Sequence, residues 1–303
     1  MKCARCEWFP LILVCFLATL WASPRAGAAV LFGQLDDFQN GTDMGWDEGG
    51  LSPNPPTNST GGLYGPSDRY HRNPATGGFG AGSRMAMIND DQWAGDYSAA
   101  GVTRIQARLV NFGPETLRMR VALTSTAGTI FASTTPVVLS PNSGWQNVTF
   151  KLTTADLTRT GGAQTLAQAL AAVDELRIVS SASPNHRGDP ALATLGLDNL
   201  RATHTPGDAN FDGVVNTADY RTLRRNFRDS LTGTPHENWT RGDFNFDRRV
   251  NSIDLALLRQ NLSGPAGAVS SDVSAVPEPA AGAAMLCGAP LLLARRRRAR
   301  GTP

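Results

Sequence analysis

The sequence predicts a mainly β protein in which a jelly-roll β-sandwich precedes a small α-helical module. Between residues 104 and 123 apolar side chains alternate with Arg and Gln, which is the period-two pattern of half-buried antiparallel strands. The 303 residues include 31 Gly and 19 Pro but only 7% aromatic residues, a composition that favours short strands joined by many turns. Near the C-terminus one pattern of Asp and Asn occurs twice, and each copy leads into a helical pattern.

We expect the sandwich to span residues 29–203. Its clearest strands cover residues 105–109 and 117–123. Further strands are expected at residues 129–133, 136–139, 145–152, 175–180 and 195–202, with one short helix near residues 163–172. Short strands at this spacing are typical of a sandwich, and the length suits a jelly roll.

Three segments of this domain carry a resemblance. They are residues 35–38 (LDDF), 144–150 (GWQNVTF) and 197–200 (LDNL). In these segments the domain resembles jelly-roll modules of the galactose-binding-like and carbohydrate-binding kind, which implies a carbohydrate ligand. In the same modules a calcium ion can join the first and last strands, a role open here to Asp36 or Asp37 with Asp198, or these are ordinary turn carboxylates.

Sugar rings stack on exposed aromatic side chains, so aromatic residues are the candidate ligand contacts. We name Trp46, Trp93 and Trp145 for this role, and the further candidates are Tyr64, Tyr70 and Tyr97. The alternative is that most of these rings belong to the core. Trp145 has the opposite parity to Val148 and Phe150, so it stands on the outer face unless a bulge returns it to the core.

The duplicated pattern has the spacing of a calcium loop. Oxygen-bearing side chains fall at loop positions one, three, five, nine and twelve, and a backbone carbonyl is expected at position seven. The first set is Asp208, Asn210, Asp212, Val214 (carbonyl), Asn216 and Asp219; the second is Asp243, Asn245, Asp247, Arg249 (carbonyl), Asn251 and Asp254. Asp and Asn also cluster in ordinary turns, but two copies in register argue against that alternative.

Each loop runs into a helix with apolar residues at helical spacing, at positions 220, 223 and 227 and at positions 255, 258 and 262. The segment before Asp208 is rich in breakers, so no helix is expected there. The second loop has Arg248 where Gly normally supplies a positive φ at position six, and we therefore predict a weaker second calcium site.

With these loops, residues 207–264 resemble a type I dockerin. The resemblance implies two bound Ca²⁺ ions and docking onto a cohesin domain. It also implies that the partner is met through loop positions ten and eleven, which are Thr217 and Ala218 in the first loop and Ser252 and Ile253 in the second. We assign residues 204–264 to this module.

Both ends of the chain read as export signals. Residues 1–28 have a basic start, a short apolar run and a small-residue cleavage site, as in a secretory signal peptide removed by signal peptidase. After a linker at residues 265–275, residues 276–303 contain Pro277, Glu278 and Pro279, an apolar run and an arginine cluster. This tail resembles a PEP-CTERM sorting tail, which implies exosortase-type processing, transient membrane association and a place at the cell surface. All four Cys lie in these terminal segments, so no disulfide is expected in the mature body.

Charge and motifs limit the function. Residues 29–275 carry 20 basic and 24 acidic residues, so the basic ends do not indicate a nucleic-acid face. No spacing singles out a pair of catalytic carboxylates, and no nucleophile or zinc motif is present. We therefore expect a secreted, non-catalytic protein that docks through calcium loops and binds carbohydrate or matrix. The alternatives are a polysaccharide-degrading enzyme or its accessory module, and a calcium-binding structural matrix protein without a cohesin partner.

Overall fold

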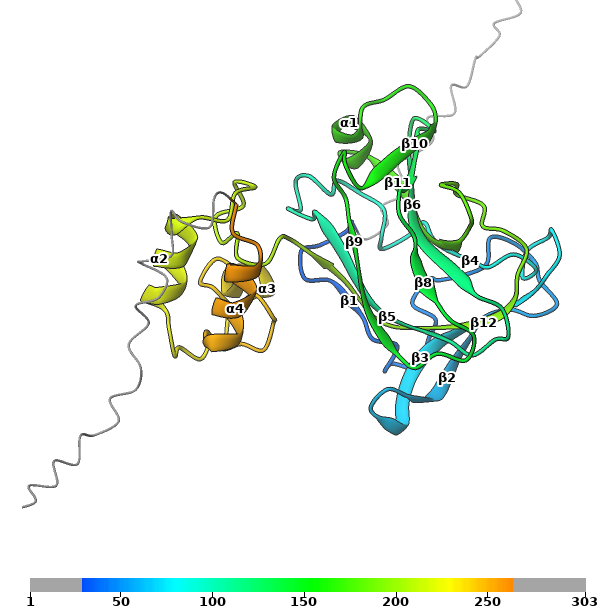
Figure 1. Cartoon of the computed structure of the whole chain (residues 1–303), viewed down its shortest axis with the longest axis horizontal. Coiled ribbons are helices and arrows are strands. Elements are labelled where there is room, and N and C mark those ends of the chain that lie inside the picture. Colours follow the sequence, from blue (N-terminus) through cyan, green and yellow to red (C-terminus); the bar gives the residue numbers. More distant parts are fainter. Residues whose placement is uncertain (1–28, 264–303) are drawn as a thin grey trace, which may run out of the picture. The chain divides into compact units, whose positions relative to one another are not determined.

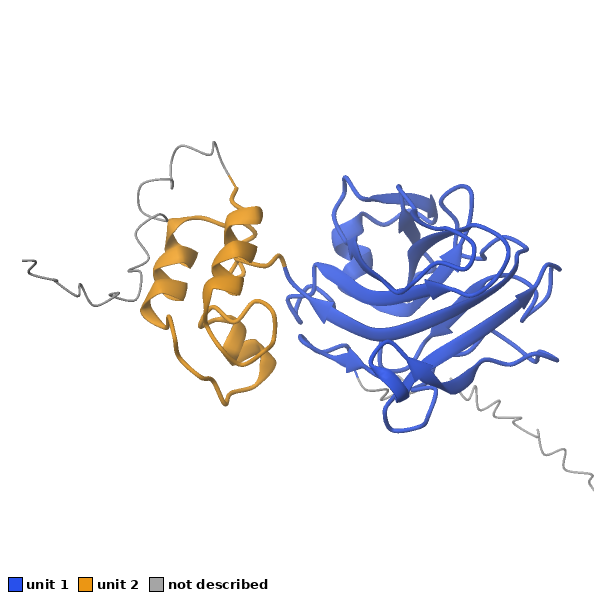
Figure 2. Ribbon diagram, turned by 60° about the horizontal axis from the view of Figure 1, so that its bottom comes forward, with its two compact units in different colours: residues 1–204 blue, residues 205–303 orange. Residues whose placement is uncertain are grey.

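The computed structural model describes residues 29–263, which divide into two compact units (Figure 2). One unit ends at His204 and the other begins at Thr205. The expected signal peptide at residues 1–28 and the sorting tail with Pro277, Glu278 and Pro279 lie outside the described residues.

The first unit is a sandwich of two six-stranded antiparallel sheets (Figure 1). Sheet A has the strand order β2-β3-β12-β5-β9, with β1 paired to β12. Its strands are β1 (Leu35–Asp36), β2 (Thr57–Gly62), β3 (Gly65–Thr76), β5 (Arg104–Asn111), β9 (Gln146–Lys151) and β12 (Leu192–Thr203).

Sheet B has the order β10-β7-β6-β11-β4, with β8 paired to β6. Its strands are β4 (Ala86–Asn89), β6 (Leu117–Ser125), β7 (Ile130–Ser133), β8 (Val137–Leu139), β10 (Leu157–Gly161) and β11 (Val173–Ser180). The chain passes repeatedly between the sheets, so that strands distant in sequence become neighbours, such as β3 and β12. The predicted mainly β jelly-roll sandwich is confirmed.

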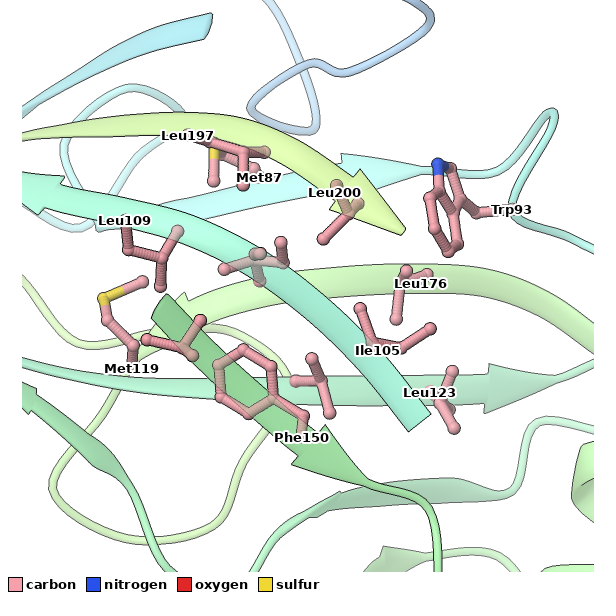
Figure 3. Close-up of a cluster of buried hydrophobic side chains, with 14 of the residues drawn as sticks. Met87, Trp93, Ile105, Leu109, Met119, Leu123, Phe150, Leu176, Leu197 and Leu200 are labelled. Carbon is pink, nitrogen blue, oxygen red and sulfur yellow. The ribbon is translucent and has the colours of Figure 1, made fainter. Parts of the chain in front are cut away.

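One apolar core fills the space between the sheets. On β5 the buried Ile105, Ala107 and Leu109 alternate with half-buried polar residues, as the period-two pattern predicts. Figure 3 shows inward side chains of both sheets meeting in this core, and those it labels are Met87, Trp93, Ile105, Leu109, Met119, Leu123, Phe150, Leu176, Leu197 and Leu200. Burial of these side chains leaves the outer faces of the two sheets free to carry polar groups and ligand contacts.

Strands β2 to β4 and strand β10 were not expected from the sequence. Strand β3 contains Pro74, which lacks the N–H needed in a central strand. The pairing of β2 with β3 ends at Thr57 and Arg72, so Pro74 lies where β3 forms an edge of the sheet. The short helix α1 (Leu166–Leu170) falls within the predicted range, and Thr165 and Gln168 form its capping box.

The second unit contains α2 (Thr217–Arg225), α3 (Pro235–Trp239) and α4 (Ser252–Gln260). Helices α2 and α4 begin at position ten of the two loops, so each loop runs into its helix as predicted, but the helices end before Phe227 and Leu262. The short α3 was not predicted. It begins with Pro235 at its first turn and brings the buried Trp239 next to the second loop.

The two repeats interlock through matching contacts. A Cβ added at Gly207 would lie 2.8 Å from Leu258 Cα, and one added at Gly242 would lie 2.9 Å from Leu223 Cα. Each loop therefore packs its opening glycine against the helix of the other repeat. The N–H of Ser263 donates to the carbonyl of Val215 at 2.9 Å, and the N–H of Arg228 donates to that of Val250 at 2.7 Å. Ser263 and Arg228 lie 35 positions apart, and so do Val250 and Val215, so the two hydrogen bonds join equivalent positions of the two repeats in opposite order. The repeats are therefore related by an approximate two-fold arrangement.

Candidate functional site

The first loop wraps its own carboxylates with backbone N–H groups. Asp208 is fully buried, and its two oxygens accept from the N–H groups of Asp212 at 3.2 Å and Gly213 at 2.7 Å. Asp219 is 1% exposed and accepts from the N–H groups of Ala209 and Asn216 at 2.8 and 2.9 Å. Asp219 also caps helix α2 together with Asn216. The loop thus holds two buried carboxylates at positions one and twelve.

The second loop repeats this geometry residue by residue. Asp243 accepts from Asp247 N–H at 3.2 Å and Arg248 N–H at 2.9 Å. Asp254 accepts from Phe244 N–H at 2.8 Å and Asn251 N–H at 2.9 Å, and it caps α4. Asp243 and Asp254 are 1% and 0% exposed. Two copies of the same hydrogen-bond set identify the loops as one motif used twice.

The remaining predicted ligands lie in the exposed part of each loop. Asp212 and Asp247 are exposed, and each accepts from the N–H two residues ahead and from the Asn side chain two residues behind, Asn210 or Asn245. The amide of Asn216 donates to the carbonyl of Val214 at 3.2 Å, whereas that of Asn251 donates to Asp247 at 3.3 Å. The two loops differ at this point, next to the position-seven carbonyls of Val214 and Arg249.

The electrostatics of the loops fit a cation. Burial raises the pKa of Asp219 above its usual range, and the nearby Asp208 adds to the shift. Burial likewise raises the pKa of Asp243, and it raises the pKa of Asp254 to about 6 with contributions from Asp243 and Asp247. Within residues 29–263 no three His, Cys, Asp or Glu side chains converge into a metal centre by themselves. A cation in these loops would therefore also need the Asn and backbone oxygens, which hard cations accept.

Arg248 adopts the backbone conformation expected of a glycine. Its φ is 64°, and the corresponding Gly213 has a φ of 84°. The left-handed region costs an L-residue about 1 kcal/mol or more, so the second loop is strained where the first is not. The Trp239 indole supports the first loop by donating to the Asp208 carbonyl at 2.7 Å.

The positions expected to meet a partner differ between the repeats. Ala218 is exposed and Thr217 is half-buried, whereas Ser252 and Ile253 are both exposed. Ile253 is 54% exposed, a large apolar side chain at the first turn of α4. The two faces are therefore unlike: the first exposes the small Ala218, and the second exposes Ser252 and the larger apolar Ile253.

Two of the three predicted carbohydrate contacts are wrong. Trp46 is 2% exposed and Trp93 is fully buried, so neither ring can stack on a sugar. Both indoles donate to the same oxygen of Asp36, at 2.8 and 2.7 Å, and Asp36 is itself 1% exposed. Tyr97 is also buried. Asp36 therefore lies in the core and away from any calcium site shared with Asp198. Strand β1 does pair with β12, as such a site between the first and last strands requires.

Trp145 stands on the outer face of sheet A. Its ring makes edge contacts with Tyr70 and Phe112, at centroid distances of 5.4 and 6.3 Å, and Tyr70 and Phe112 lie 5.7 Å apart. We call these three rings the aromatic cluster. They cover Gly196, where an added Cβ would lie 3.0 Å from Phe112 and 3.1 Å from Trp145. Phe112 is 41% exposed and was not singled out in the sequence, because one Phe after a strand gives no signal by itself.

Polar side chains surround the aromatic cluster. The register places Arg72 opposite Gly196, Arg108 opposite Asp198, and Asn147 opposite Arg108. Burial raises the pKa of Asp198 to about 7, and the carboxylates of Asp68 and Asp37 add to the shift while Asn199 opposes it. Rings with hydrogen-bonding groups beside them are the usual composition of a sugar-binding surface.

Two carboxylates of the sandwich are paired with basic side chains. Asp43 accepts a hydrogen bond from Nδ1 of the buried His71 at 3.0 Å, and Glu175 is paired with Arg177 at 2.8 Å. A cleft over β4 and β11 has one carboxylate, Glu48, among its lining residues.

Within residues 29–263 no helix is long and apolar enough to cross a membrane.

Comparisons with known proteins bear on the second unit most directly. Residues 206–263 match the model of the dockerin type I domain, which confirms the resemblance for this part of the chain. No curated protein sequence matches the chain.

Several solved structures resemble part of the chain. An exo-beta-agarase matches with 14% identity and a TM-score of 0.41 over 57% of this chain, which spans only 25% of that protein. A family 11 carbohydrate-binding module from Clostridium thermocellum, in complex with a β-1,3-1,4-mixed-linked tetrasaccharide, matches with 16% identity and a TM-score of 0.34 over 58% of this chain and 98% of that one. A sialidase matches with 10% identity and a TM-score of 0.34 over 70% of this chain and 23% of that one. At these scores the likenesses assign neither ligand nor activity.

Proposed function

We propose that this chain is a secreted, surface-associated, non-catalytic protein in which a calcium-dependent docking module carries a carbohydrate-binding β-sandwich. The observation that carries the proposal is the dockerin type I match at residues 206–263, on a unit whose two loops repeat one set of hydrogen bonds. Surface attachment rests on the sequence of the terminal segments, which lie outside the described residues.

The docking module takes two Ca²⁺ ions, one in each loop. Buried carboxylates with raised pKa values support this, because a divalent cation would offset their mutual repulsion. The ligands in each loop are the oxygens of the sets predicted from the sequence, with the carbonyls of Val214 and Arg249 at position seven. The strained Arg248 favours weaker binding in the second loop.

The partner of this module is a cohesin-type domain. Exposed residues at the start of α2 and α4, Ala218 and Ser252 with Ile253, support docking through either repeat. The interlocked repeats hold both helix starts in fixed geometry, and loss of calcium would release the loops that precede them.

A calcium-dependent binding assay tests this proposal. The immobilised protein is presented to a panel of cohesin domains in calcium and in chelator, and we expect at least one cohesin to bind only in calcium. Replacing the exposed Asp212 and Asp247 with Ala should abolish binding, whereas Asp229→Ala, at an exposed carboxylate outside the loops, should not. If calorimetry shows calcium uptake but no cohesin binds, a calcium-dependent matrix role replaces docking.

The ligand of the sandwich is a carbohydrate, bound over the aromatic cluster. The partly exposed Phe112 and Trp145 offer ring faces, and Arg72, Arg108 and Asn147 offer hydrogen bonds on the same face of sheet A. The rings of Phe112 and Trp145 lie over Gly196, where a larger residue would push them apart. The glycine at this position therefore supports the proposal that the cluster binds a ligand.

Polysaccharide binding with point variants tests the sandwich. We expect Trp145→Ala and Phe112→Ala to lower affinity for a bound polysaccharide about ten-fold or more, because each ring stacked on a sugar contributes about 1–2 kcal/mol. Tyr64→Ala removes a 71% exposed ring outside the cluster and should leave binding unchanged. Release of reducing sugar by the wild-type protein would contradict the non-catalytic assignment.

A further inference from the structure

The cleft over β4 and β11 lies on the outer face of sheet B. It has a volume of about 230 Å³ and is bounded by Ala86 and Ile88 of β4 and by Arg177 of β11. Ile88 and Arg177 are register partners, and their neighbours Met87, Leu176 and Ile178 point into the core. The cleft therefore belongs to sheet B, opposite the sheet that carries the aromatic cluster.

Three arginines from separate segments face this cleft: Arg84, Arg177 and Arg187. Arg84 is held in place, because its Nε donates to the Phe79 carbonyl at 3.1 Å and its Nη1 to the Gly188 carbonyl at 2.7 Å. Arg177 is neutralised by Glu175. The Arg187 guanidinium is exposed and makes no hydrogen bond or ion pair among residues 29–263. Two guanidinium charges are thus available to a ligand.

Glu48 is the second unusual group in the cleft. It is only 9% exposed, yet its carboxylate has no hydrogen-bond partner in the described part of the chain. Its two carboxylate oxygens are therefore available to accept hydrogen bonds from the donors of a ligand or of solvent. Sugar hydroxyls are such donors.

An aromatic ring lies at the edge of the same cleft. Phe79 is 80% exposed, and the Arg84 guanidinium lies over the ring at 5.2 Å from its centroid. Burial, followed by the charges of Arg177 and Arg187, lowers the pKa of the neighbouring His186.

We propose that this cleft binds a hexuronate, a single sugar residue that carries a carboxylate. The carboxylate is placed against Arg187 and the remaining N–H groups of Arg84, since guanidinium and carboxylate form strong paired hydrogen bonds. Glu48 accepts from the hydroxyls, and the ring of Phe79 covers the apolar face of the sugar. The cleft is smaller than the pockets of about 300–1,000 Å³ that hold drug-sized ligands, which favours one ring.

Titration of the full protein with small sugars tests this site. Glucuronate, galacturonate, glucose, inorganic sulfate and free glycine are compared by calorimetry or by NMR shifts. We expect both hexuronates to bind at least ten times more tightly than glucose, sulfate or glycine. Arg187→Ala should weaken hexuronate binding ten-fold or more, and Glu48→Gln should weaken it as well. Arg118→Ala, at an exposed arginine of β6 outside the cleft, should have no effect.

Several outcomes would overturn the proposal. Glucose binding as tightly as the hexuronates would remove the role of the arginines, and sulfate binding equally well would leave a simple anion site. Tighter binding of glycine would indicate an amino-acid ligand instead. Because Arg187 is exposed and unpaired, a folded Arg187→Ala variant with unchanged affinity would also count against the site. Trp145→Ala should leave hexuronate affinity unchanged, which separates this proposal from sugar binding on sheet A.

Discussion

Trp93 donates its indole N–H to the carboxylate of Asp36 at 2.7 Å, across 57 residues of sequence. The same oxygen accepts from Trp46 at 2.8 Å, and Gln92 donates to both oxygens at 2.9 and 3.0 Å. A buried carboxylate with three side-chain donors ties β1, the following loop and the segment after β4 into one network. The two tryptophans that were expected to contact a carbohydrate therefore donate their hydrogen bonds to a buried aspartate instead.

We predict that Asp36→Ala destabilises the sandwich by about 2–4 kcal/mol, because it leaves two buried indole N–H groups and an amide without partners. Chemical unfolding followed by tryptophan fluorescence measures this change. The neighbouring Asp37 is half-exposed and supports only a local turn, so Asp37→Ala should cost about 1 kcal/mol or less. Equal effects of the two substitutions would show that the network does not stabilise the fold.

The raised pKa of Asp198 predicts a pH dependence of stability. The carboxyl has a pKa of about 7 in the folded state and an ordinary value of 3.8, so folding favours its protonated form. Its contribution is complete below about pH 4 and is lost as the pH rises through 7. In chelator, the free energy of unfolding should therefore fall between pH 4 and 7.

Asp198→Asn should flatten that profile and stabilise the protein at pH 8 by about 1–3 kcal/mol, since each pKa unit corresponds to about 1.4 kcal/mol. Unfolding midpoints at several pH values measure this. A variant that is less stable than wild type at pH 8 would show that the ionised carboxylate is favourable in the fold.

The strained Arg248 predicts unequal calcium sites. Arg248→Gly should tighten the second site by about five-fold, because it relieves a backbone strain of about 1 kcal/mol. Gly213→Ala introduces the corresponding strain into the first loop, where φ is 84° and nothing lies near the added Cβ, and should weaken that site by a similar factor. Calorimetry on the full protein resolves both steps. Two equally tight calcium sites in the wild-type protein would contradict this prediction.

The interlocked glycines predict that either repeat depends on the other. Gly242→Ala should destabilise the second unit by about 2–4 kcal/mol, because its φ is 107° and the new Cβ would meet Leu223 Cα at 2.9 Å. Thermal unfolding of the calcium-loaded protein measures the loss. Gly128→Ala is the matched control: φ is 74° there and the space is open, so only the cost of conformation, about 1 kcal/mol, applies.

Local patterns predicted most of the strands in the second half of the sandwich. Period-two alternation at residues 105–109 and 117–123 coincides with β5 and β6. On β5 one face is buried and the other half-buried, whereas β6 is buried on both faces apart from Arg118 and the half-buried Thr124, so its expected half-buried character is wrong. The pattern fails for β2 and β3, whose Gly, Pro and Asn read as loop. Those strands exist because β12 supplies a pairing edge more than a hundred residues later, which no local window contains.

By itself the sequence determined the duplicated loop pattern, since its Asp and Asn positions lie within twelve consecutive residues and the last of them lies in the first turn of the helix. It also determined the class of fold, because alternation and turn composition are local properties. Only the tertiary structure decided which aromatic rings are exposed. Burial depends on partners distant in sequence: Asp36 draws Trp46 and Trp93 into the core, while Tyr70 and Phe112 hold Trp145 on the outer face of sheet A.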